Sequence, residues 1–224
     1  RFIAGVDIND SSLVFQKHLD SEYSVIANLV GENIQSKEKI DSIFKDYSDL
    51  LSQFKHQNFS ISLKLSSIGL DVSYDECRAN LIALASIAKE NNQALRLDME
   101  DSSYTSKTIE LSKVIDKELP GVIGITLQAN LFRTKDDIDD LLRNGISIRL
   151  VKGAYRENSG NAFSELKKIR EHFIQYSNKL IEDSVIKHSI ATHDEILLNE
   201  ICTKEAMKKH RFEFLYGVRR DIQR

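Results

Sequence analysis

Five polar residues could carry chemistry because they stand at or just beyond the ends of short apolar segments. They are Lys64, Asp98, Gln128, Arg149 and Lys152. A buried charge is costly unless it is paired or used, so an apolar segment has no structural reason to end in such residues. They therefore indicate either a binding or catalytic site or a layer of ion pairs that neutralise one another.

The spacing of these residues predicts where their side chains point. In a β-strand, successive side chains face opposite sides. In residues 61–65, three aliphatic side chains share one face and Lys64 falls on the other; the same alternation separates Asp98, Gln128 and Arg149 from the apolar residues of their segments. If these segments are neighbouring parallel strands, the four side chains converge at the strand ends where barrel enzymes place their active sites.

The segments that must position these residues alternate along the whole chain. Short apolar runs predict seven strands, at residues 23–30, 59–65, 94–99, 122–127, 146–151, 185–192 and 212–216. Apolar residues at helical spacing predict helices at residues 9–19, 36–54, 73–90, 104–118, 136–143, 161–181 and 195–209, with Ser36 as an N-cap.

This alternation predicts an α/β fold, a (β/α)8 TIM barrel truncated after its seventh strand, with residues 1–224 forming a single domain. Such a barrel typically needs about 250 residues, so we expect an eighth strand and helix to be missing and residues 219–224 to begin a helix. A doubly wound open sheet is the alternative. It is disfavoured because no G-x-G-x-x-G motif follows the first strand.

Composition narrows the classes of partner. The 224 residues are 41% hydrophobic and 29% charged with a net charge of −3. This charge does not indicate binding to nucleic acid or to an anionic membrane surface. No apolar run approaches the roughly 18 residues of a transmembrane segment. Cys77 and Cys202 imply no disulfide framework and favour a reducing cytosol. Small soluble ligands are the expected partners.

The histidines predict no metal site. His188 and His193 are five residues apart, but they lack histidine and carboxylate partners at the spacing of known metal sites. The stretch Thr192-His193-Asp194 is expected either to cap the following helix or to contact a cofactor. The remaining histidines are expected to lie in solvent: His18, His56, His172 and His210.

Six segments at the predicted strand ends resemble the proline dehydrogenase family, both its monofunctional bacterial members and the catalytic barrel of the bifunctional proline-utilisation enzymes. The resemblance covers essentially the whole chain and keeps the order of the family's motifs. The segments are ISLKLS with IGL (61–66 and 68–70), RLDMEDS (96–102), LQA (127–129), RLVKGAY (149–155), IATHD (190–194) and LYGVR (215–219).

The resemblance implies an enzyme that uses FAD to oxidise L-proline to Δ1-pyrroline-5-carboxylate, the first step of proline catabolism, and passes electrons to a quinone. It implies a cytoplasmic protein with peripheral membrane contact, or a mitochondrial matrix protein in a eukaryote. By the same resemblance, Asp98 and Arg149 are catalytic, and Lys64 and Tyr155 bind the substrate. FAD would be held by Met99, Gln128, Arg149, Lys152, Gly153, Ala154, Thr192 and His193.

General chemistry agrees with these implied roles. Positive charge from Arg149 and Lys152 would stabilise a reduced, anionic flavin, and Gly153 would let the backbone approach the cofactor without a Cβ. Asn130 stands where the family usually has an aromatic residue. The family's substrate-binding arginine pair belongs to the eighth helix, and Arg219-Arg220 is not that pair.

Two other functions are consistent with the same residues. One is a barrel lyase or aldolase in which Lys64 or Lys152 forms a Schiff base with a carbonyl substrate. The other is a non-catalytic barrel fragment that serves as an interaction module.

Overall fold

The computed structural model describes residues 3–223. Seven strands form one sheet in the order β1 to β7, and the pairs β1–β2, β2–β3, β5–β6 and β6–β7 are parallel. The strands are β1 (Val25–Ala27), β2 (Phe59–Leu63), β3 (Leu95–Leu97), β4 (Ile123–Gln128), β5 (Ser147–Val151), β6 (Ser189–Ala191) and β7 (Arg211–Glu213). This is the strand order of a (β/α)8 barrel through its seventh strand.

Helices connect the strands, as the apolar spacing predicted. They are α1 (Ile8–Asp20), α2 (Lys37–Gln53), the 3-10 helix η1 (Leu65–Ile68), α3 (Tyr74–Glu90), α4 (Thr105–Glu118), α5 (Thr134–Arg143), α6 (Leu166–Glu182), α7 (Glu195–Ile201) and α8 (Lys204–Lys209). The predicted cap is confirmed: the Ser36 hydroxyl accepts a hydrogen bond from the N–H of Lys39 at 3.4 Å.

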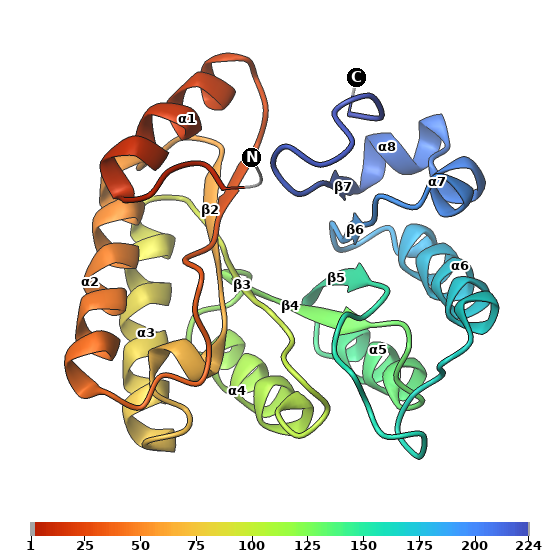
Figure 1. The fold of residues 1–224 in the computed structure, drawn as a ribbon, viewed down its shortest axis with the longest axis horizontal. Helices are drawn as coiled ribbons and strands as arrows, with labels where there is room; N and C mark the ends of the chain where they lie inside the picture. Colours follow the sequence, from red (N-terminus) through yellow and green to blue (C-terminus); the bar gives the residue numbers. More distant parts are fainter. Residues whose placement is uncertain (1–2, 224) are drawn as a thin grey trace. The chain divides into compact units, whose positions relative to one another are not determined.

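The chain divides into two compact units. Unit 1 contains residues 3–98 and 110–124, and unit 2 contains residues 99–109 and 125–223. In unit 1, α2 and α3 lie side by side along β2 (Figure 1), and the core includes fully buried Tyr47, Phe54 and Leu63. In unit 2, α5 and α6 pack against β5 (Figure 1). The single domain over residues 1–224 stays a prediction.

Three predicted helix boundaries are wrong. The helix expected over residues 195–209 is two helices, because Thr203 caps a new one: its hydroxyl accepts a hydrogen bond from the N–H of Ala206 at 3.1 Å. The helix expected from residue 161 begins at Leu166. The helix expected from residue 219 is absent among residues 219–223, since Arg219 adopts a left-handed φ of 48° and its guanidinium binds Asp221.

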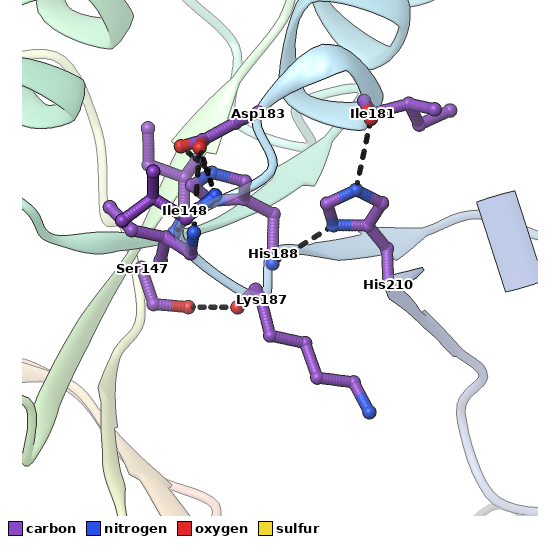
Figure 2. A network of polar contacts seen from close by, with 9 residues as sticks. Ser147, Ile148, Ile181, Asp183, Lys187, His188 and His210 are labelled. Atoms are coloured by element: carbon purple, nitrogen blue, oxygen red, sulfur yellow. Dashed lines mark hydrogen bonds and ion pairs between the residues drawn. The ribbon is translucent and has the colours of Figure 1, made fainter. Parts of the chain in front are cut away.

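Two stacked histidines in unit 2 join β5, β6 and β7 (Figure 2). The Nδ1 atom of His188 accepts a hydrogen bond from the N–H of Ile148 at 3.1 Å, and Nδ1 of His210 accepts one from the N–H of His188 at 3.2 Å. The Nε2 atoms face an Asp183 carboxylate oxygen and the Ile181 carbonyl. The expectation that His210 lies in solvent is wrong, because it is 3% exposed.

No helix within residues 3–223 is both long and apolar enough to cross a membrane. Within the same residues, no group of three or more histidine, cysteine or acidic side chains is placed to hold a metal ion.

Candidate functional site

Lys64 follows β2 directly and is the residue before the 3-10 helix η1. Its ammonium lies 2.5 Å from a carboxylate oxygen of Glu32, and the two side chains are 26% and 38% exposed. Lys64 is therefore a solvent-accessible cation at the carboxyl end of its strand, as its place in the sequence predicted. Its partner Glu32 was not identified from the sequence.

Asp98 follows β3 and is held by Asn28, the first residue after β1. The Asn28 amide donates to Oδ2 of Asp98 at 2.8 Å and to the carbonyl of Ser62 at 3.0 Å. The buried hydroxyl of Tyr47 donates to the same carbonyl at 3.2 Å and accepts from the N–H of Leu29 at 3.2 Å. Burial raises the pKa of Tyr47 far above its usual range. Asp98 thus rests on a hydrogen-bonded support that joins the ends of β1 and β2.

Arg149 lies within β5 and its guanidinium is paired across β6 with a residue of β7. Its Nε is 2.6 Å from a carboxylate oxygen of Glu213, and the two side chains are only 11% and 13% exposed. A desolvated pair of this kind holds the arginine in one orientation. Glu213 was missed by the sequence reasoning, although it stands inside a predicted strand as a lone acidic residue between two phenylalanines.

Lys152 is the first residue after β5 and faces Asp194, the N-cap of α7. The ammonium of Lys152 lies 3.0 Å from Oδ2 of Asp194. Arg170 of α6 binds the same carboxylate at two points, with Nε at 2.9 Å from Oδ2 and Nη2 at 3.2 Å from Oδ1. Burial alone would raise the pKa of Asp194, but hydrogen bonds from Arg170 and Lys152 outweigh it and hold that pKa below its usual value.

Gly153 has a local reason to be glycine. Its φ is +106°, a conformation that residues with a side chain rarely adopt, and a Cβ added there would lie 2.1 Å from Oδ1 of Asn130. That Oδ1 is buried without a hydrogen-bond partner among the described residues. The space beside Gly153 is thus filled by Asn130.

Thr192 and His193 follow β6. Thr192 is buried, and its hydroxyl accepts a hydrogen bond from the N–H of Asp194 at 3.2 Å. His193 accepts one at Nε2 from the N–H of Leu215 at 3.0 Å. Burial, Arg219 and Lys152 lower the pKa of His193, so the ring is held neutral. Both residues shape the turn that leads to Asp194.

The other predicted cofactor and substrate residues lie in unit 2 as well. Gln128 is buried at the end of β4, where its amide donates to the carbonyl of Glu100 at 2.9 Å. Met99 is buried, Ala154 is exposed and Tyr155 is partly exposed. Since Lys64 and Asp98 lie in unit 1 and Gln128 and Arg149 in unit 2, their convergence stays a prediction.

A sheet whose strands lie side by side in chain order, joined by helices and followed by charged side chains, is typical of (β/α)-barrel enzymes, whereas a doubly wound sheet reverses its strand order. The fold comparison agrees. The crystal structure of proline utilization A (PutA) from Bdellovibrio bacteriovorus, inactivated by N-propargylglycine, matches 96% of this chain with a TM-score of 0.83 at 20% identity. The match covers 28% of that longer chain. The predicted fold class is confirmed.

Sequence comparisons define the family within this class. A family model described as Proline dehydrogenase matches residues 14–223. Proline dehydrogenase 2 of Bacillus subtilis (strain 168) is 32% identical over 235 residues, covering 100% of this chain and 75% of that protein. Proline dehydrogenase of Deinococcus radiodurans is 29% identical over 238 residues, covering 100% and 76%. The chain belongs to the proline dehydrogenase family.

Proposed function

We propose that this protein is a flavin-dependent proline dehydrogenase that oxidises L-proline to Δ1-pyrroline-5-carboxylate and passes the electrons to a quinone. The observation that carries the proposal is the match of the whole chain to proline dehydrogenases, and the charged residues at the ends of β2, β3 and β5 support it. FAD, when bound, supplies the hydride acceptor.

The side chains of unit 2 fit a flavin by their charge and hydrogen-bonding capacity. Three cations, Arg149, Lys152 and Arg170, face two carboxylates, those of Glu213 and Asp194. The excess positive charge suits an anionic cofactor. The buried Oδ1 of Asn130 is an unused acceptor of the kind that a ligand N–H can satisfy. We assign FAD binding to Met99, Gln128, Arg149, Lys152, Gly153, Ala154, Thr192 and His193.

The substrate is assigned to polar residues of both units. Lys64 can bind the carboxylate of L-proline, because its ammonium already faces a carboxylate oxygen of Glu32. Asp98 is the active-site carboxylate that pairs with cationic groups, oriented by the amide of Asn28. Arg149 is the second catalytic residue, and Tyr155 helps to enclose the substrate and exclude water.

The electron acceptor bears on where the protein works. Quinones are dissolved in membranes, so we propose a cytoplasmic protein that touches the inner membrane peripherally to reach its acceptor.

An anaerobic titration of the purified, FAD-loaded protein with L-proline tests the function. We expect the absorbance of the oxidised flavin to bleach with L-proline and to persist with D-proline. A flavin that stays oxidised with L-proline but is reduced by another amine would show that the substrate is wrong. A protein that retains no flavin would favour the non-catalytic fragment.

The Schiff-base alternative is tested separately. Borohydride would trap a carbonyl substrate covalently on Lys64 or Lys152, and mass spectrometry would locate the adduct. We expect no adduct, because each ammonium faces a carboxylate, as suits a charged side chain rather than a neutral amine nucleophile.

A further inference from the structure

The carboxylate of Asp194 has more partners than a helix cap requires. An N-cap needs one side-chain oxygen that accepts a backbone N–H, and Oδ1 does this for Ile196 at 3.2 Å. Serine, threonine or asparagine would serve equally well. Yet the Asp194 side chain is 6% exposed and also binds the cations of Lys152 and Arg170. Capping therefore leaves its negative charge unexplained.

The geometry of Arg170 suits a fixed anchor. Arg170 extends from α6 and meets both carboxylate oxygens of Asp194, at 2.9 and 3.2 Å. Such a two-point contact sets the orientation of the carboxylate as well as its position. The Oδ2 atom that faces Lys152 at 3.0 Å also accepts the Nε–H of Arg170, which ties it to α6.

The charges of this cluster do not cancel. Lys152 and Arg170 contribute two positive charges and Asp194 one negative charge, which leaves one net positive charge. Without Arg170, Asp194 alone would neutralise Lys152. The side chains of Lys152 and Arg170 are 34% and 30% exposed, so a ligand can reach either cation; Lys152 is the one that directly follows β5.

We propose that Arg170 and Asp194 are positioning residues for Lys152: they fix its ammonium after β5 and, because Asp194 is shared between two cations, leave its charge only partly compensated, so that it binds an anionic group of the flavin dinucleotide. This inference rests on the proposed function, which assigns Lys152 to the cofactor. The anionic group is either the pyrophosphate or the reduced flavin ring, both of which are negatively charged.

The experiment measures the dissociation constant of FAD by fluorescence quenching in the wild type and in Arg170→Gln, Arg170→Lys and Arg133→Gln. Arg133 is a matched control in the same unit, because it binds Asp137 at two points, 2.7 and 3.0 Å, and contacts no assigned site residue in that pairing. We expect Arg170→Gln to weaken FAD binding about fivefold, as for one partly screened charge, with a smaller effect at high salt. Arg170→Lys should recover most of the affinity, and Arg133→Gln should match the wild type.

The midpoint potential of the bound flavin distinguishes the two anionic groups. A more negative potential in Arg170→Gln identifies the reduced ring, and an unchanged potential with weaker binding identifies the pyrophosphate. Equal FAD affinities in Arg170→Gln and Arg133→Gln, together with an unchanged midpoint potential, would overturn the proposal. If proline still bleaches the flavin in that case, the function stands without the inference; a wild type that binds no FAD would refute both.

Discussion

The two units hold the cations on or next to their strands in different ways. In unit 1, Lys64 pairs with Glu32, and both side chains are substantially exposed. In unit 2, Arg149 pairs with Glu213 of β7, and both are nearly buried. An exposed ion pair contributes about 0–1 kcal/mol, whereas removing one partner of a buried pair costs about 3–5 kcal/mol. Arg149 is thus part of the scaffold, whereas Lys64 can exchange its partner for a substrate.

Replacing the two cations should give the largest contrast. We expect Arg149→Met to lower the free energy of unfolding by about 3 kcal/mol, because the Glu213 carboxylate loses the guanidinium beside it. We expect Lys64→Met to lower it by less than about 1 kcal/mol. Urea denaturation of both variants measures the difference.

A double variant tests whether the loss of stability in Arg149→Met comes from the unpaired carboxylate of Glu213. Arg149→Met with Glu213→Leu should be more stable than Arg149→Met alone, because the buried carboxylate is then gone. If Arg149→Met and Lys64→Met lower the free energy of unfolding by similar amounts, Arg149 is no more a part of the scaffold than Lys64.

A second contrast concerns the buried side chain that accepts a backbone N–H in each unit, which is His188 in unit 2 and Tyr47 in unit 1. His188→Leu removes the acceptor for the Ile148 N–H and the partner of Asp183 (Figure 2), so we expect a loss of about 2–3 kcal/mol. In unit 1, Tyr47→Phe removes one hydroxyl shared by Leu29 and Ser62 and should cost about 1 kcal/mol. Hydrogen exchange at the Ile148 N–H should speed up only in His188→Leu. An unchanged rate there would show that His188 does not hold this N–H.

A substitution in the turn after β5 should destabilise the protein less. The loss of stability at Gly153 has two causes. Gly153→Ala should lose about 2 kcal/mol, from the positive φ and from the clash with Asn130. Gly145→Ala, with a φ of +73° and nothing within 4 Å of the added Cβ, should lose only the backbone part, about 1 kcal/mol. Thermal unfolding compares the two. Adding Asn130→Ala should rescue Gly153→Ala partly, and a complete rescue would mean that the φ of residue 153 costs nothing.

Periodicity and alternation predicted the strands, the positions of Lys64 and Asp98 directly after β2 and β3, and the position of Arg149 within β5, because these depend on neighbours in sequence. The partners of these residues could not be predicted in the same way. Glu213 is 64 residues from Arg149 and Asn28 is 70 residues from Asp98, and only the folded chain brings them together.

Hydrogen bonds between single polar side chains and the backbone explain two other misses. His210 follows a polar helix in sequence, which suggested solvent exposure, yet its ring accepts the N–H of His188 and stacks on that residue. The break between α7 and α8 depends on the Thr203 cap. A single polar side chain that bonds to the backbone can end or begin a helix within an otherwise helical pattern.

The smallest expected effect concerns the charge of Asp194. Because its pKa is lowered in the folded state, its ion pairs stabilise the protein above the ordinary pKa of an aspartate, and this contribution is lost as pH falls through the lowered value. Asp194→Asn keeps an N-cap for α7 but lacks these pairs, so we expect it to be about 1 kcal/mol less stable at pH 7. Urea denaturation at several pH values should show the wild type converging on the variant below about pH 4. If the difference in stability between the wild type and Asp194→Asn is the same at all pH values, Asp194 stabilises unit 2 through its packing and not through its charge.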